Sequence, residues 1–306
     1  MGVLSRPTEG LVAELRPYHV KPGLELVEAW STFRLPFQPK GHSLGLRTQL
    51  AEKIKSLTSR GPTDVVTCVY QSIEPSFVDS ENVLVYNVGA SAFSKIAERG
   101  IRFERVTQYP PPCSQPLPPP GALHYVSYRL AAPTAEFAHW KRGKPIASWV
   151  DAPWPVQGGT SPTPFWLAIR LAKPQLINTA RDRTTLLGLR VTVTGGDRSI
   201  GPATMIKPIF DAAISAFHVH NDPVAMSAAI ERLVSRGRGD RATLERLLTD
   251  GRFDLLGARN LLSPYREGAK WNPEDERCVA GDLLWTPKSG PKQFSGELFE
   301  VLPRPN

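Results

Sequence analysis

The segment "NVLVYNVGASAFSKIAERGIRFERVT", residues 82–107, decides the predicted fold class. Its two ends, residues 82–87 and 101–107, are rich in β-branched and aromatic side chains and predict strands. The middle predicts a short helix that ends at Gly100. A strand–helix–strand unit this compact fits either a parallel or a mixed sheet.

The flanking sequence extends this pattern in both directions. Residues 65–71, 122–130, 165–172 and 185–195 also predict strands. Prolines interrupt residues 1–42, which we expect to be irregular or extended, and a first helix is expected from Ser43. After residue 200, apolar residues recur at helical spacing in three segments, 203–217, 223–236 and 240–251, before an irregular tail.

These elements predict an α/β or α+β fold with a mixed, largely antiparallel sheet, short helices and a helical C-terminal third. The loop at 151–164 suggests two lobes, an N-terminal β/α lobe at 1–150 and a C-terminal lobe at 165–306. A single domain remains the alternative, because the length of 306 residues fits either organisation.

The composition favours an anionic partner. The net charge is +8 and the pI is near 9.5, and surplus Lys and Arg attract phosphate. The three cysteines, Cys68, Cys113 and Cys278, are too far apart for a disulfide framework or a paired-cysteine metal site. No signal-peptide pattern and no apolar run of about 18 residues occurs, so we expect a cytoplasmic protein without membrane contact.

The stretch "IKPIFDAAISAFHVHNDP", residues 206–223, gathers chemically active side chains. Lys207, Asp211 and His218 form a stripe beside the apolar face of the predicted helix, where a cleft would receive them. Lys207 and Asp211 are also an i,i+4 pair, which is common on helix surfaces. Together with Asp222, Lys207 and Asp211 are the candidate catalytic residues.

The same stretch offers a competing metal site. His218 and His220 would share one face of a strand, and Asp222 would be a third ligand for Mg²⁺ or Mn²⁺. Asp222 is equally explained as a helix N-cap, because Pro223 and an amphipathic run follow it. Both interpretations stay open at this point.

Residues 207–222, "KPIFDAAISAFHVHND", resemble the lysine-helix-aspartate segment of the RusA-type Holliday-junction resolvases. Those enzymes hold a divalent metal with an Asp-x-Asp-Asn element just before that lysine. Here residues 199–205 carry no carboxylate, and a similar element, Asp79-Ser80-Glu81-Asn82, lies more than a hundred residues upstream. We do not assign the chain to that family on this segment.

Asp79 and Glu81 could bind one Mg²⁺ through oxygen atoms if they share a strand face. A turn that leads into a strand explains them as well. We keep them as reserve ligands.

Basic residues beside aromatic or glycine residues are the candidate nucleic-acid contacts, because such side chains grip phosphates and stack on bases. They are Arg47, Lys53, Lys55, Trp140, Lys141, Arg142, Arg236 and Arg238.

Three classes of function follow. The first is a nucleic-acid-binding component of a larger complex that also has protein partners. The second is a metal-dependent nuclease or phosphodiesterase that uses the Asp/His cluster at 211–222. The third is a non-catalytic scaffold subunit whose proline-rich loops, such as residues 109–121, contact other proteins. No Walker loop, Gly-x-Ser-x-Gly elbow or His-Glu-x-x-His helix occurs.

Overall fold

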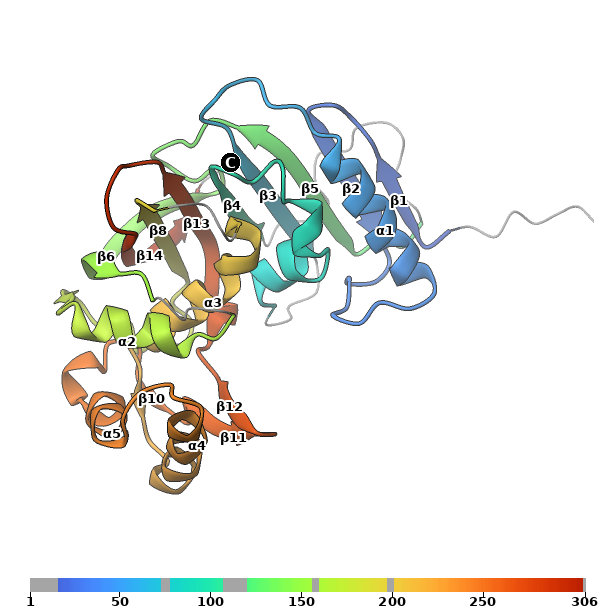
Figure 1. Cartoon of the computed structure of the whole chain (residues 1–306). Coiled ribbons are helices and arrows are strands. Elements are labelled where there is room, and N and C mark those ends of the chain that lie inside the picture. Colours follow the sequence, from blue (N-terminus) through green and yellow to red (C-terminus); the bar gives the residue numbers. More distant parts are fainter. Residues whose placement is uncertain (1–15, 73–77, 107–119, 156–159, 197–200, 305–306) are drawn as a thin grey trace, which may run out of the picture.

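A mixed sheet of ten strands forms the centre of the computed structural model, which describes residues 16–72, 78–106, 120–155, 160–196 and 201–304 (Figure 1). Its strand order is β1-β2-β5-β3-β4-β13-β8-β14-β6-β7. The N-terminal strands are β1 (Tyr18–Lys21), β2 (Leu26–Ser31), β3 (Val65–Ser72), β4 (Gly100–Val106) and β5 (His124–Ala131). The others are β6 (Trp140–Pro153), β7 (Gln175–Leu176), β8 (Leu187–Thr194), β13 (Cys278–Thr286) and β14 (Gln293–Pro303).

Helices and small strand pairs complete the fold. The α-helices are α1 (His42–Lys55), α2 (Thr163–Leu171), α3 (Pro202–Ser215), α4 (Pro223–Ser235) and α5 (Arg241–Thr249). Single helical turns are η1 (Asn82–Tyr86), η2 (Ala90–Ala92), η3 (Gly251–Phe253) and η4 (Asp275–Arg277). The paired short strands are β9 (Val219–His220) with β10 (Ala258–Arg259), and β11 (Leu262–Tyr265) with β12 (Gly268–Trp271).

The two halves of the sheet repeat one topology. When the intervening elements η2, β7, β9, α4, α5, η3, β10, β11, β12 and η4 are left out, the chain order β2-α1-β3-η1-β4-β5 in the first half matches β6-α2-β8-α3-β13-β14 in the second. The sheet neighbours match as well, since β2-β5-β3-β4 and β6-β14-β8-β13 each end in a parallel pair. The halves join where β4 and β13 run antiparallel, as a two-fold axis through the sheet requires. The predicted lobe boundary at 151–164 remains a prediction, and one sheet spans both halves.

A dense apolar layer holds the helices on the sheet at this junction. On β3, Cys68 and Tyr70 are buried, and Phe103 of β4 packs on Phe210 of α3 with ring centroids 5.4 Å apart. A Cβ atom on Gly281 of β13 would lie 2.4 Å from the Phe210 ring, so only glycine allows α3 to approach this closely. Helix α3 is therefore fixed across the seam between the halves.

The predicted fold class is wrong in its C-terminal third, which is not helical. Helices α4 and α5 occupy only residues 223–249, and strands β10 to β14 follow them. The central strand β13 was missed because it is buried on both faces, so its sequence lacks the apolar–polar alternation of a half-exposed strand.

Three local predictions also fail. Residues 82–87 were expected as a strand but form the π-type turn η1, closed by a hydrogen bond from Asn87 N to Asn82 O of 2.7 Å. Residues 165–172 were expected as a strand but lie mostly in α2, where Pro164 fits the first turn. Residues 90–99 were expected as a short helix but contain only the 3-10 turn η2. Strands β1 and β2 lie within residues 1–42, which were expected to be irregular or extended.

Candidate metal centre

Lys207 of α3 lies at the centre of four carboxylates. Its ammonium nitrogen, Nζ, is 3.0 Å from Asp79 Oδ2, 3.0 Å from Asp211 Oδ1 and 3.0 Å from Asp275 Oδ2. Glu81 Oε1 is 3.4 Å away. We call these five residues the carboxylate cluster.

The cluster is assembled from three segments that are distant in sequence. Asp79 and Glu81 stand at the start of η1, Asp211 follows Lys207 by one turn of α3, and Asp275 begins η4 before β13. The first pair comes from the first half of the sheet and the others from the second half. The cluster therefore lies at the seam, and π-type turns such as η1 are frequent at functional sites.

The electrostatics of the cluster are unbalanced. One ammonium and four ionised carboxylates would carry a net charge of −3 (+1 − 4) in a buried place. Burial, with the charges of Glu81 and Asp275, raises the pKa of Asp79 to about 11. Burial likewise raises the pKa of Asp211 to about 8, although Lys207 opposes it. The site therefore holds protons that an ordinary carboxylate would release.

The remaining groups share the imbalance. Burial raises the pKa of Glu81. Burial disfavours the charged form of Lys207, but the carboxylates outweigh it and raise the pKa of that ammonium. Burial also opposes the charge on Asp275, yet Lys207 and hydrogen bonds lower the pKa of this carboxyl. One positive side chain is thus shared among more negative groups than it can neutralise.

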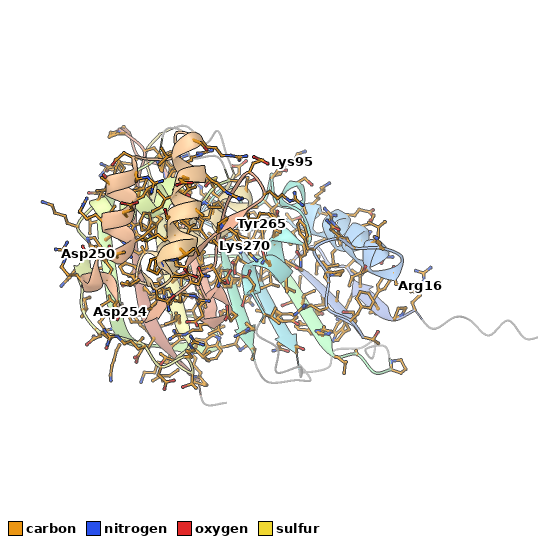
Figure 2. All side chains as sticks on the ribbon, turned by 90° about the horizontal axis from the view of Figure 1, so that it is seen from below. Arg16, Lys95, Asp250, Asp254, Tyr265 and Lys270 are labelled. Carbon is orange, nitrogen blue, oxygen red and sulfur yellow. The ribbon has the colours of Figure 1, made fainter. Side chains whose placement is uncertain are left out.

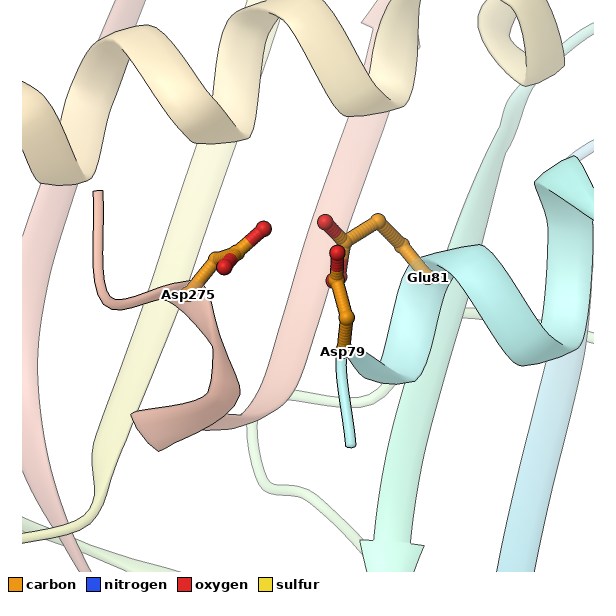
Figure 3. A group of neighbouring side chains, drawn as sticks. All are labelled: Asp79, Glu81 and Asp275. Atoms are coloured by element: carbon orange, nitrogen blue, oxygen red, sulfur yellow. The ribbon is translucent and has the colours of Figure 1, made fainter. Parts of the chain in front are cut away.

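Three of the carboxylates are placed so that together they could hold a metal ion. One oxygen each from Asp79, Glu81 and Asp275 lie within 4.8 Å of one another, and the three side chains point into one space beneath α3 (Figure 3). Three buried oxygens have no hydrogen-bond partner among the described residues. Two belong to these carboxylates, Asp79 Oδ1 and Glu81 Oε2, and the third is Asn82 Oδ1 of the neighbouring side-chain amide. Hard oxygen donors of this kind suit Mg²⁺ or Mn²⁺.

A groove of about 1220 Å³ gives access to the cluster. Asp79, Lys207 and Asp211 line it, so these side chains meet the solvent there. Its other polar lining includes Arg34, Arg47 and Lys270, and its aromatic lining includes Phe37, Tyr86 and Tyr265. An acidic floor is therefore framed by basic and aromatic side chains.

The structure brings together only part of the predicted site. Lys207 and Asp211 meet the reserve ligands Asp79 and Glu81 in the cluster. Asp222 caps α4, and its carboxylate accepts hydrogen bonds from the backbone of Val224 and Ala225.

The two histidines hold backbone groups. His218 Nδ1 lies 2.9 Å from Gly257 O, and His220 Nδ1 accepts from the backbone nitrogens of Leu261 and Leu262. His220 Nε2 lies 2.7 Å from the Asp222 carbonyl oxygen. These contacts tie β9 to β10 and β11, so both rings already have a structural role.

Asp275 was missed in the sequence. The segment "WNPEDER" predicts a helix start with acidic residues near the positive N-terminal end of the helix dipole. The chain turns at this point, so Asp275 points away from its acidic neighbour Glu274. Glu274 has a left-handed backbone with φ of 66°, and it pairs with Arg277 at 3.1 Å, while Asp275 reaches Lys207. No local pattern separates the two roles.

The predicted nucleic-acid contacts do not form one surface. Arg47, Lys53 and Lys55 lie on α1 near β1 and β2, whereas residues 140–142 lie on β6 and residues 236 and 238 follow α4, far apart in Figure 1. Trp140 is buried and donates from Nε1 to Arg105 O, so its ring is closed to a base. Arg142 pairs with Glu297 at 2.6 Å. Of this set, Arg47 lines the groove.

Comparison with known proteins gives no family. No protein-family model, no curated protein and no solved structure matches this chain. Among the described residues, no helix is long and apolar enough to cross a membrane. The proline-rich segment 109–119 lies outside the described residues.

Proposed function

We propose that this protein is a divalent-metal-dependent phosphodiesterase that cleaves nucleic-acid strands, with Asp79, Glu81 and Asp275 as metal ligands. The setting of the carboxylate cluster supports this, because it lies at the floor of a groove whose rim carries cations suited to phosphates. Mg²⁺ is typically held in such enzymes by a few carboxylates together with substrate phosphates.

The observation that carries the proposal is the unpaired oxygen of Glu81. The Glu81 side chain is only 1% exposed, and its Oε2 has no hydrogen-bond partner among the described residues. The ammonium of Lys207, which contacts the other oxygen of Glu81, is shared with three further carboxylates. A buried, unsatisfied carboxylate oxygen costs free energy in the metal-free protein. A bound cation would satisfy that oxygen and reduce the excess negative charge of the cluster.

Each residue has a role in this proposal. A divalent ion held here would polarise a phosphoryl oxygen and supply a reactive water. Asp211, next to the ligand set on α3, would take the proton of the attacking water once the bound ion has favoured its ionised form. The new P–O bond forms as the bond to the leaving sugar oxygen breaks, and that oxygen takes a proton from solvent. Lys207 would exchange its contacts with Asp79, Glu81 and Asp275 for the negative charge of the phosphate when the ion binds.

The resemblance noted in the sequence gains weight from this arrangement. The Asp79-x-Glu81-Asn82 element and the lysine-helix-aspartate segment are far apart in sequence, but Lys207 contacts Asp79 and Glu81 directly. The resolvase-like set of an acidic element and a lysine helix would thus be completed across the seam, one part from each half of the sheet.

The test is cleavage of labelled DNA and RNA by the full chain with Mg²⁺, Mn²⁺ or a chelator. We expect metal-dependent cleavage that is lost in Asp79→Asn, Glu81→Gln and Asp275→Asn. The matched control is Asp222→Asn, because asparagine caps a helix as well as aspartate and the residue lies outside the cluster. Cleavage that persists in the three cluster variants, or that is lost only in Asp222→Asn, would refute the proposal.

A further inference from the structure

A stacked aromatic pair stands at the rim of the groove. Phe37 precedes α1 and Tyr86 ends η1, and their ring centroids lie 5.3 Å apart with planes 6° from parallel. The two residues are 59% and 49% exposed. Large apolar rings that stay this exposed, side by side, are a feature of surfaces that bind a partner.

The pair is held in place by the core below it. The side-chain amide of Asn87, next to Tyr86, is buried and donates to Leu35 O at 2.9 Å, and Leu35 is itself buried. This bond ties the loop that carries Phe37 to η1. The stacked rings are therefore preorganised, and a ligand that uses them need not order them first.

Cations accompany the rings. Arg34 is exposed, and Arg47 donates from Nε to Val88 O at 3.2 Å, which fixes its guanidinium beside the groove. Lys270 and Tyr265, both labelled in Figure 2, lie on the β11–β12 hairpin and both line the groove. Within the described ranges, no carboxylate forms an ion pair with Arg34, Arg47 or Lys270.

We propose that the groove binds single-stranded nucleic acid, with an unpaired base stacked on the Phe37–Tyr86 pair and the backbone phosphates held by Arg34, Arg47 and Lys270. Unpaired bases offer their π faces to aromatic side chains, whereas the bases of a duplex are already stacked on each other. The inference rests on the proposed function only in that the bound strand would be cleaved; binding of the strand does not depend on it.

The acidic floor favours a single strand for a steric reason too. Of the carboxylates that line the groove, Asp79 is 22% exposed and Asp211 12%, so a phosphate must enter the groove to meet them. One flexible strand can bend into the groove while its bases remain on the rim. The preference for single strands is thus a consequence of depth as well as of stacking.

The test is fluorescence anisotropy of short labelled single-stranded DNA, single-stranded RNA and duplex DNA, measured in chelator so that no cleavage occurs. We expect tighter binding of single strands than of the duplex, and Phe37→Ala to weaken it about 10-fold, as expected for one lost stacking partner. Tyr86→Phe keeps the ring and should stay within about 2-fold of wild type. Leu302→Ala, an exposed apolar residue on β14, is the matched control for loss of surface apolar area.

Salt dependence tests the cations separately. Three phosphate contacts predict that log K falls with log salt with a slope of about −2. Lys270→Gln should make this slope less steep by about 0.7. The control Lys144→Gln removes an exposed lysine on β6 that does not line the groove, and it should leave the slope unchanged.

The outcomes separate the two proposals. Strand binding without cleavage in any metal would refute the proposed function and support this inference. Cleavage of duplex that is unaffected by Phe37→Ala, with no preference for single strands, would refute this inference and leave the proposed function standing. Preference for RNA over DNA, or the reverse, would identify the source of the strand and support the inference.

Discussion

Two buried charged groups near the seam of the sheet behave in opposite ways. Arg102 of β4 and Asp282 of β13 are paired by two hydrogen bonds of 2.5 and 2.9 Å, and Arg190 adds a contact of 3.1 Å to the same carboxylate. Arg102 also donates to Thr134. In the carboxylate cluster, by contrast, four acids share the single ammonium of Lys207.

This difference distinguishes a charged group that stabilises the fold from one that is suited to bind a ligand. The acid in the Arg102–Asp282 group has both oxygens engaged, so its burial is compensated within the protein. The carboxylate cluster leaves oxygens of Asp79 and Glu81 unpaired among the described residues and raises their pKa values. A charge imbalance that the protein leaves uncorrected points to a ligand that corrects it.

The largest expected effect is on catalysis. Glu81→Gln removes a proposed metal ligand, and a bound ion typically contributes several kcal/mol to catalysis, so the proposed cleavage should fall by about 1000-fold or more. Single-turnover rates at saturating Mn²⁺ would measure the loss. A rate that stays within about 10-fold of wild type would remove Glu81 from the site.

Substitution in the Arg102–Asp282 pair should instead lower the stability of the fold. Asp282→Ala leaves Arg102 buried without its partner, which we expect to lower the free energy of unfolding by about 3–5 kcal/mol. Urea unfolding measures this, with Arg142→Gln as control, since its exposed pair with Glu297 should contribute less than about 1 kcal/mol. Equal effects of the two variants would erase the contrast between buried and exposed pairs.

Among the described residues, buried His218 has no charged hydrogen-bond partner, and its Nδ1 contacts the carbonyl oxygen of Gly257. Burial lowers the pKa of its imidazole to about 4, so the folded protein keeps the ring neutral below the usual value of 6.5. Its stabilising contribution is present above pH 6.5 and is lost as the pH falls toward 4, by about 3 kcal/mol in total.

Thermal unfolding from pH 7 to pH 4.5 tests this by comparing wild type with His218→Gln. The difference in stability between the two proteins should change in favour of the variant as the pH falls. A difference that stays constant with pH would show that His218 does not titrate as a buried neutral ring.

At Asp211 a substitution is expected to increase stability rather than decrease it. The pKa of Asp211 is raised to about 8, so the folded protein holds a proton there that the unfolded chain releases above about pH 4. Stability of the metal-free protein should therefore fall as pH rises from about 4 to about 8. Asp211→Asn removes this titration, so the variant should gain stability relative to wild type as the pH rises from 4.5 to 8. A loss of stability at pH 8 would mean that Asp211 is a balanced structural acid.

The sequence predicted those parts that depend on local pattern. The helix with Lys207 and Asp211 follows from the spacing of Ile206, Phe210 and Ala213, and α3 covers it. The cap by Asp222 was one of two open interpretations, and the hydrogen bonds to Val224 and Ala225 match it.

What depends on long-range contact could not be predicted. The meeting of Asp79 with Lys207 spans 128 positions, and it depends on β4 pairing with β13 at the seam. Strand β13 itself was hidden because a strand buried on both faces shows no alternation. Asp275 had no signal, since acids at a predicted helix start are explained by the dipole alone.

The most direct measurement is a calorimetric titration of the metal-free chain with Mn²⁺ at pH 8. It would compare wild type with Glu81→Gln and Asp222→Asn. We predict a saturable Mn²⁺ site in wild type and Asp222→Asn, absent in Glu81→Gln, with protons released on binding. Binding that survives in Glu81→Gln, or no saturable binding in wild type, would contradict a metal centre at the carboxylate cluster.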